Sequence, residues 1–292
     1  MDFGSLITAM VTPFNQAEQV DELALSRLID HLIRTGTTAI LACGTTGESP
    51  TLTHDEKLQL FEATLRAVDG RVPVLVGTGS NVTKQSIELS REAVALGVDG
   101  LLLVAPYYNK PSQEGLYAHF ASIADAIDLP VMIYNVPGRT SVNIETDTIL
   151  RLAQIPNVFA VKEASGIFTQ IAHIAAEKPD DFLLYSGDDK FTLPMLSLGA
   201  AGVVSVASHV VGSEMRQMMD LFWHGETEEA AIWSARLLPM FEGLFATSSP
   251  APVKAALSLI GQPVGSVRQP LLPVSGALEA HLQELLHRLG KI

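Results

Sequence analysis

The run Leu101-Leu102-Leu103-Val104-Ala105 is the clearest clue to the fold of this chain. Every side chain in it is apolar, whereas a strand with one face in water alternates apolar and polar residues. Strands that are apolar on both faces are typical of a parallel sheet that helices cover on its two sides. The run therefore predicts a fully buried strand in an α/β protein.

Similar short apolar runs recur along the chain, and each is followed by a longer segment of helical periodicity. The expected strands cover residues 6–11, 39–43, 73–77, 101–105, 131–134, 158–162, 182–186 and 203–206. The expected helices between them cover residues 21–35, 53–68, 83–96, 113–126, 144–154, 166–177 and 189–198. Eight strands that alternate with seven helices favour a (β/α)8 TIM barrel over a doubly wound open sheet, which usually has fewer strands.

Local signals mark where several of these helices begin and end. Thr53 and Glu56 form a capping-box pattern, and Thr83 is expected to cap the next helix in the same way. Glycines stand where helices are expected to stop: Gly36, Gly70, Gly97 and Gly199.

The C-terminal part of the chain holds more helices than a barrel needs. Helical patterns cover residues 213–224, 227–244, 251–260 and 275–289, whereas a barrel needs one helix after its last strand. We therefore expect residues 1–224 to form the catalytic barrel. Residues 225–292 are expected to form a helical C-terminal extension that packs on the barrel and is not an independent domain.

Composition narrows the classes of function. The 292 residues are 47% hydrophobic and 17% charged, which excludes disorder for most of the chain. The 19 basic and 32 acidic residues give a net charge of −13, which argues against a nucleic-acid partner. The single cysteine, Cys43, is typical of the reducing cytoplasm. Residues 1–12 lack a basic segment, and no apolar run reaches the roughly 20 residues of a membrane span, so a soluble protein is expected.

Polar residues gather at the ends of several expected strands, where the reactive groups of a (β/α)8 barrel lie. They are residues 44–48, 107–109, 134–139, 162–165 and 186–189. Asp188 and Asp189 are interpreted as a helix N-terminus rather than as a cation site. The eight histidines have no metal-ligand spacing, and no nucleotide-binding glycine motif follows a strand, so the sequence shows neither a histidine metal motif nor a nucleotide-binding motif.

Lys162 is the most informative of these residues. It is the only one of the eight lysines that continues an apolar strand run, residues 158–161. Apolar surroundings disfavour the ammonium form and leave a neutral amine that can attack a carbonyl to form an imine. The alternative is a strand-end lysine whose ammonium reaches solvent, and Lys162 alone does not decide between the two.

Further polar residues support the first interpretation. The hydroxyl of Tyr134 can shuttle a proton, Thr45 and Thr46 offer hydroxyls to a carboxylate, and the Arg139 guanidinium can bind a carboxylate through two nitrogens. Each is also compatible with a structural role: a core tyrosine, an ordinary turn or a solvated arginine. Together with Lys162 they indicate a lysine-dependent aldolase or lyase that acts on a keto acid.

At these residues the sequence resembles the dihydrodipicolinate synthase family, also called 4-hydroxy-tetrahydrodipicolinate synthases, within the N-acetylneuraminate lyase superfamily of class I aldolases. The resemblance runs from Gly4 through the C-terminal helices and rests on residues 42–48, 106–111, 134–140 and 161–165. It implies condensation of pyruvate with L-aspartate 4-semialdehyde, the first committed step towards diaminopimelate and lysine. It implies no metal or organic cofactor.

The resemblance also assigns roles to single residues. Lys162 matches the lysine that forms the Schiff base with pyruvate, and Tyr134 matches the proton donor and acceptor. Thr45 and Tyr108 match the rest of the proton relay, and Tyr108 is donated across a dimer interface. The remaining matches are substrate contacts: Thr46 for the pyruvate carboxylate, Arg139 for the relay and the second carboxylate, and Gly187 and Val204 for the pocket backbone.

Two alternatives stay open. Relatives with the same barrel and lysine act on N-acetylneuraminate or keto-deoxy sugar acids. The Gly138-Arg139 pair and the Thr45-Thr46 pair favour the synthase, because a short semialdehyde acid needs an arginine more than it needs contacts to sugar hydroxyls. A catalytically silent barrel that binds keto acids is the other alternative, and the complete set of relay residues argues against it.

The resemblance further implies regulation and assembly. Residues of an effector cleft at the dimer interface retain similar character at Ser49, His54, Asn81 and Tyr107. Lys57 and Gln85, however, stand where lysine-inhibited relatives carry a His and a Glu. The added positive charge and the lost carboxylate both disfavour a lysine cation, so weak or absent lysine inhibition is expected. A homotetramer built as a dimer of dimers is expected.

Overall fold

The computed structural model describes residues 2–292, and their strands alternate with helices as expected. The strands are β1 (Leu6–Ala9), β2 (Ala39–Ala42), β3 (Val74–Gly77), β4 (Gly100–Val104), β5 (Val131–Asn135), β6 (Val158–Glu163), β7 (Leu183–Ser186) and β8 (Gly202–Ser205). They are parallel and close into a barrel in chain order, from β1 to β8. The predicted (β/α)8 TIM barrel is thus confirmed.

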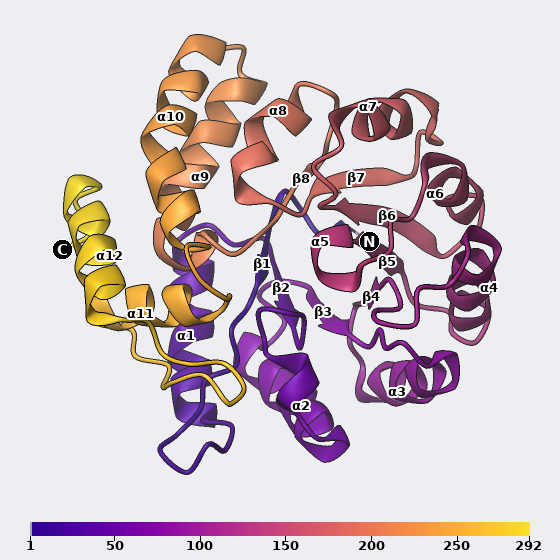
Figure 1. The fold of residues 1–292 in the computed structure, drawn as a ribbon, viewed down its shortest axis with the longest axis horizontal. Coiled ribbons are helices and arrows are strands. Elements are labelled where there is room, and N and C mark those ends of the chain that lie inside the picture. The colour runs from indigo at the N-terminus through magenta and orange to yellow at the C-terminus, as the bar shows by residue number, and fades with distance from the viewer. Residues whose placement is uncertain (1) are drawn as a thin grey trace. The chain divides into compact units, whose positions relative to one another are not determined.

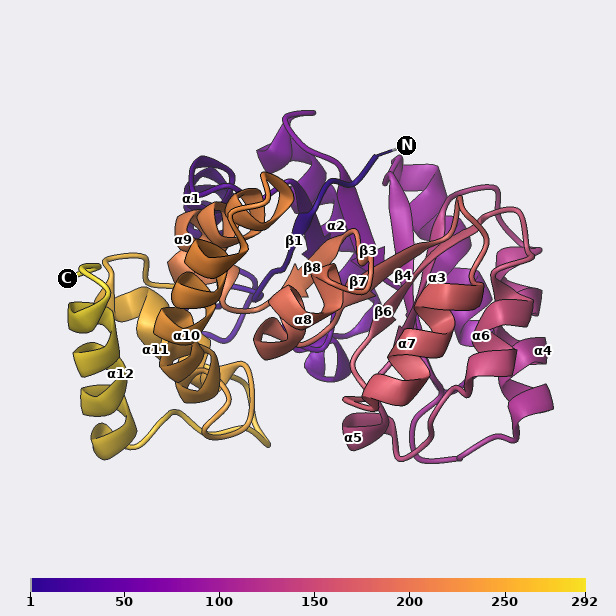
Figure 2. The same ribbon diagram turned by 90° about the horizontal axis from the view of Figure 1, so that it is seen from above.

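The chain divides into two compact units, which are described separately: Pro73–Val204, and the chain up to Val72 together with Ser205–Ile292. In the unit Pro73–Val204, the helices lie alongside β3–β7 (Figures 1 and 2). They are α3 (Thr83–Leu96), α4 (Gln113–Ala124), α6 (Thr146–Leu152) and α7 (Phe168–Glu177), with the short α5 (Pro137–Thr140), η2 (Asp189–Phe191) and α8 (Thr192–Leu196).

The other unit contains the N-terminal and C-terminal elements. Its helices are α1 (Glu22–Arg34), η1 (Ser49–Thr51), α2 (His54–Val68), α9 (Ser208–Trp223), α10 (Thr227–Gly243), α11 (Ala251–Leu259) and α12 (Gly276–Arg288). Helix α10 packs on α9, and α12 packs on α10 and α11 (Figure 1). Within residues 2–292, no helix is long and apolar enough to cross a membrane.

Strand β4 confirms the interpretation of its apolar run, because Leu101, Leu102 and Leu103 are at most 3% exposed. The capping box of α2 is also present: Glu56 N–H donates to Thr53 Oγ1, and Thr53 N–H donates to the Glu56 carboxylate. The prediction that Thr83 caps α3 is wrong. Thr83 is the first helical residue, and its hydroxyl instead pairs with His119 Nδ1 on α4 at 2.9 Å.

The register of the strands fixes which side chains stand together at their carboxyl ends. Val104 of β4 pairs with Tyr134 of β5, Tyr134 pairs with Lys162 of β6, and Lys162 pairs with Tyr185 of β7. Parallel strands in register carry such neighbours on the same face of the sheet. The next pair, Asn135 and Glu163, therefore lies on the opposite face from Tyr134 and Lys162.

Candidate active site

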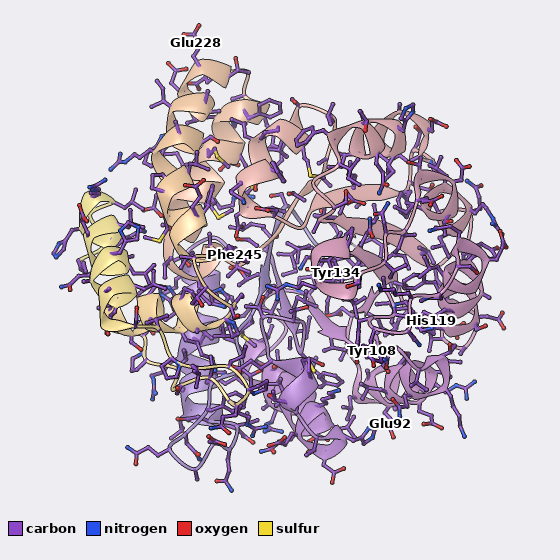
Figure 3. All side chains as sticks on the ribbon, viewed as in Figure 1. Glu92, Tyr108, His119, Tyr134, Glu228 and Phe245 are labelled. Carbon is purple, nitrogen blue, oxygen red and sulfur yellow. The ribbon has the colours of Figure 1, made fainter. Side chains whose placement is uncertain are left out.

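Lys162 and Tyr134 form the centre of the candidate site. They end the neighbouring strands β6 and β5, and Lys162 Nζ lies 4.2 Å from the centroid of the Tyr134 ring (Figure 3 labels Tyr134). Lys162 is only 5% exposed, so it is not a strand-end lysine whose ammonium reaches solvent. The two residues that the sequence analysis placed on neighbouring strands are in contact.

Burial changes the acid–base chemistry of Lys162. Burial lowers the pKa of the ammonium to about 7. The negative charge of Asp189 opposes this shift, and the positive charge of Arg139 adds to it. At pH 7 about half of the amines are then neutral, whereas an ordinary lysine is well under about 0.1% neutral. Because the neutral amine is the nucleophile, Lys162 is suited to attack a carbonyl carbon at neutral pH.

Tyr134 is held in its neutral form. Burial raises the pKa of its phenol to about 12, with Arg139 opposing the shift and the carboxylates of Asp188 and Glu163 adding to it. A neutral phenol can donate its own proton while accepting another at the same oxygen. Tyr134 can therefore pass a proton next to the Lys162 amine without becoming a phenolate.

Arg139 lies on α5, a single helical turn that the sequence analysis did not anticipate. Pro137 opens this turn, which suits proline because its fixed φ is already helical and its missing N–H would have no helical partner. Arg139 is exposed, and its charge lowers the pKa of both Lys162 and Tyr134. The positive charge of Arg139 thus acts on both central residues.

Gly187 provides the space that the Lys162 side chain occupies. A Cβ at Gly187 would lie 3.1 Å from Lys162 Cγ and 2.8 Å from Ala164 Cβ, too close for a side chain. The Gly187 N–H donates to the Glu163 carbonyl at 2.8 Å, which ties the end of β7 to β6. Val204, also predicted as a pocket residue, is buried on β8.

A polar cluster on the opposite face of β5 and β6 was not anticipated. The Glu163 carboxylate accepts from Asn135 Nδ2 at 3.0 Å and from the Ser165 N–H at 2.6 Å. Asn135 Oδ1 accepts from the Ile144 N–H at 3.0 Å, and Gln170 joins the cluster through Ile144. Polar residues directly after Tyr134 and Lys162 in two buried strands were the available signal. The cluster fixes the ends of both strands.

Tyr108 stands apart from the buried centre. It lies in the loop after β4 with a φ of 74°, and it is 88% exposed (Figure 3). Its N–H donates to the Thr140 carbonyl at 3.4 Å, so its backbone contacts the end of α5. Its contribution to the site of a partner subunit stays a prediction.

Thr45 and Thr46 follow β2 in the other unit, in a tightly closed loop. Thr46 is buried and Thr45 is half-buried. The Glu48 N–H donates to the Thr45 carbonyl at 3.1 Å, and the Thr12 hydroxyl donates to the Gly47 carbonyl at 2.6 Å. The two threonines belong to a different unit from Lys162, and their approach to it stays a prediction.

The predicted effector-cleft residues fall into two groups. Asn81 Nδ2 donates to the Tyr107 carbonyl at 3.1 Å, and Gln85 Oε1 accepts from the Ser80 hydroxyl at 3.3 Å. In the other unit, Ser49 opens η1, and His54 and Lys57 lie one turn apart on α2. That the two groups form one effector cleft stays a prediction.

The interpretation of Asp188 and Asp189 as a helix N-terminus is confirmed. The Asp188 side chain accepts from the Lys190 N–H at 3.0 Å and caps η2. In the part of the chain that the structure describes, no three His, Cys, Asp or Glu side chains are grouped as a metal ion would need.

The chain is similar to known proteins of one family over nearly its whole length. The model of the dihydrodipicolinate synthetase family matches residues 2–289. The 4-hydroxy-tetrahydrodipicolinate synthase of Bacillus subtilis is 55% identical over 276 residues, covering 94% of this chain and 95% of that protein. The crystal structure of a dihydrodipicolinate synthase from Bacillus anthracis matches with a TM-score of 0.97 at 50% identity, covering 98% of each chain. That of DHDPS from Cyanidioschyzon merolae with lysine bound matches with a TM-score of 0.97 at 47% identity, covering 99% of each chain.

These matches span nearly the whole chain. The matches to solved structures agree with the closed barrel of eight parallel strands among residues 2–292. This chain therefore belongs to the dihydrodipicolinate synthetase family.

Proposed function

We propose that this protein condenses pyruvate with L-aspartate 4-semialdehyde through a Schiff base on Lys162. The observation that carries the proposal is the buried Lys162 amine, whose pKa is lowered to about 7 and which lies against the Tyr134 ring. Membership of a family whose relatives are named 4-hydroxy-tetrahydrodipicolinate synthase supports it.

The first stage forms the Schiff base. The neutral Lys162 amine attacks the keto carbon of pyruvate, and a proton moves from nitrogen to oxygen to give a carbinolamine. Tyr134 donates a proton to the departing hydroxyl and accepts another from the relay, so water leaves and an iminium remains. The iminium withdraws electrons from the adjacent methyl group. The relay takes up one methyl proton, and an enamine remains.

The second stage makes the carbon–carbon bond. The enamine carbon attacks the aldehyde carbon of the semialdehyde, and the aldehyde oxygen takes a proton from the relay. The carbon bound to Lys162 is then an iminium again. The amino group of the semialdehyde attacks this carbon, closes the ring and displaces Lys162 as a free amine. We assign Thr46 to the pyruvate carboxylate and Arg139 to the second carboxylate, because a guanidinium binds a carboxylate through two nitrogens. Thr45 and Tyr108 complete the proton relay with Tyr134.

The assembly follows from Tyr108. Tyr108 is 88% exposed and has a left-handed backbone. An aromatic ring gains little from contact with water, so such a side chain is well suited to contact a partner subunit. We therefore propose at least a homodimer, and a tetramer as a dimer of two such dimers, in the cytoplasm. Sedimentation velocity at micromolar concentration tests this, and a monomer with full activity would refute the donation of Tyr108.

We also propose that lysine inhibits this protein weakly or not at all. Lys57 and Gln85 stand where lysine-inhibited relatives carry a His and a Glu, and both the added positive charge and the lost carboxylate disfavour a bound lysine cation. Half-inhibition by lysine below about 1 mM, at substrate concentrations near KM, would contradict this proposal.

The test of the reaction is a product assay. Pyruvate is incubated with the enzyme and, in separate reactions, with aspartate semialdehyde, N-acetylmannosamine and a short sugar aldehyde, and products are identified by mass spectrometry. Product with aspartate semialdehyde alone supports the proposal. Product with a sugar aldehyde instead would make the protein a sugar-acid lyase, and the absence of any product would make it a keto-acid-binding barrel.

A further inference from the structure

A buried carboxylate, Glu48, links the loop of Thr45 and Thr46 to the C-terminal part of the chain. Glu48 directly follows this loop, and its side chain is fully buried. Its Oε1 lies 2.7 Å from Lys254 Nζ on α11, and its Oε2 accepts from the Arg268 N–H at 2.9 Å. All of these residues belong to one unit of the structure.

Lys254 is fixed on several sides. It is 3% exposed, donates to the Ser266 carbonyl at 2.8 Å and lies with its Nζ 4.3 Å from the centroid of the Phe14 ring. Burial lowers the pKa of Lys254 to about 8, although Glu48 opposes this shift. At neutral pH Lys254 is therefore mostly an ammonium whose protons are used by protein acceptors.

Arg268 secures the far side of the same loop. Its guanidinium donates to the Thr51 carbonyl at 3.0 Å and to the Glu56 carboxylate at 2.9 Å, and it stacks 4.2 Å from the Phe14 ring centroid. The hydrogen bond from Arg268 lowers the pKa of Glu56 to about 2. The segment around Arg268 thus holds both Glu48 before η1 and Glu56 at the start of α2.

The backbone of Glu48 adopts a conformation that is unfavourable for a residue with a side chain. Glu48 has a left-handed conformation with a φ of 56°, which glycine adopts readily and glutamate adopts at a cost. Its N–H donates to the Thr45 carbonyl, so the position of Glu48 is coupled to that of the threonines. A buried ion pair is seldom the most stable way to fill such a space, and its recurrent use is to fix one arrangement.

We propose that Glu48 and Lys254 are positioning residues that, through the C-terminal segment, hold Thr46 where it binds the carboxylate of pyruvate. The inference rests on the proposed function, because it takes the assignment of Thr46 from there. Helix α11 and the segment that follows it would then contribute indirectly to substrate binding. Neither Glu48 nor Lys254 touches substrate, and both act through the loop.

The test is the double variant E48Q/K254M, which removes both charges together and keeps the size of both side chains. The new amide still accepts from the Arg268 N–H, and a methionine thioether packs well on an aromatic ring, so this variant is expected to fold. We expect the KM for pyruvate to rise about tenfold, while the KM for the semialdehyde, assigned to Arg139, stays unchanged. The matched control is E114Q/R151M, which removes an exposed ion pair of 2.5 Å and is expected to leave both KM values unchanged.

Three outcomes are distinguishable. A selective rise in the KM for pyruvate, with trapping of pyruvate on Lys162 retained at saturation, supports the inference. A wild-type KM for pyruvate, or an equal rise in both KM values together with a lower Tm, overturns it, because general loosening does not discriminate between substrates. If the wild-type protein itself makes no product from the semialdehyde, the proposed function fails, but the positioning role does not. The affinities of the wild-type protein and of E48Q/K254M for pyruvate then test the positioning role.

Discussion

Lys162 on β6 and Lys254 on α11 are both buried, and both lie over an aromatic ring, at 4.2 Å from the centroid of Tyr134 and 4.3 Å from that of Phe14. Their partners differ. Glu48 contacts Lys254 at 2.7 Å, whereas Asp189 raises the pKa of Lys162 through its charge. The pKa of Lys162 falls to about 7 and that of Lys254 to about 8.

Burial alone therefore does not make a lysine reactive. The ammonium of Lys254 is paired with the Glu48 carboxylate and donates a hydrogen bond to a backbone carbonyl, so it has a structural role. Lys162 is buried beside a tyrosine that can pass protons, and its neutral amine is available for chemistry.

Lys162→Met should abolish activity. Without an amine no Schiff base forms, so we expect kcat to fall by at least about 10⁴-fold. Methionine is apolar and of similar length, so the Tm should stay the same or rise. Steady-state assays and thermal unfolding measure both effects. K84M, at a lysine exposed on α3, is the control and should keep full activity. Turnover by Lys162→Met above about 1% of wild type would contradict the assignment.

Lys254→Met should act on stability instead. It leaves the buried Glu48 carboxylate without its cation, so we expect the free energy of unfolding to fall by about 3–5 kcal/mol. Urea unfolding followed by circular dichroism measures this change. The E48Q/K254M variant should recover most of the loss, because neither charge is then left uncompensated. A single variant within about 1 kcal/mol of wild type would show that the pair does not behave as a buried ion pair.

Tyr134→Phe should separate proton transfer from packing. The ring under Lys162 is kept and the hydroxyl is lost, so we expect kcat to fall by about 10²–10³-fold with a Tm close to wild type. Y117F, at a ring that stacks under Arg151 on the outside of the same unit, is the matched control. If Tyr134→Phe keeps wild-type kcat, the proton passes through another group.

The pH dependence should report the pKa of Lys162. The rate of reductive trapping with pyruvate and cyanoborohydride is expected to fall about tenfold per pH unit below pH 7 and to level off above pH 8, because only the neutral amine reacts. The folded pKa lies below the unfolded value of 10.5, so burial of Lys162 costs stability below pH 7. This cost disappears as the pH rises towards 10.5. A trapping midpoint above pH 9 would show an ordinary, solvated lysine.

Much of the fold and part of the site could be predicted from sequence because their signals are local. Each strand is a continuous apolar run, each long helix has its period, and Lys162 stands out because it extends such a run. Helix α5 was missed because four residues are too few to show a period. The capping role of Thr83 was wrong because its hydroxyl pairs with His119, which lies 36 residues further along the chain.

Contacts between segments that are distant along the chain leave no local pattern in the sequence, so they could not be predicted from it. Glu48 and Arg268 are 220 residues apart, and neither neighbourhood indicates the other. The Asn135–Glu163 contact depends on the register of β5 against β6, which a single sequence does not specify. Gly187 shows the same limit, since its need for glycine appears only when the Lys162 side chain is in place.

The most direct test of the account is to map the lysine that pyruvate modifies. The protein is treated with pyruvate and borohydride, digested, and searched by mass spectrometry for the reduced adduct at every lysine. We predict one adduct, on Lys162, none on the equally buried Lys254, and none anywhere without pyruvate. An adduct on Lys254 or on a surface lysine, with Lys162 unmodified, would contradict it.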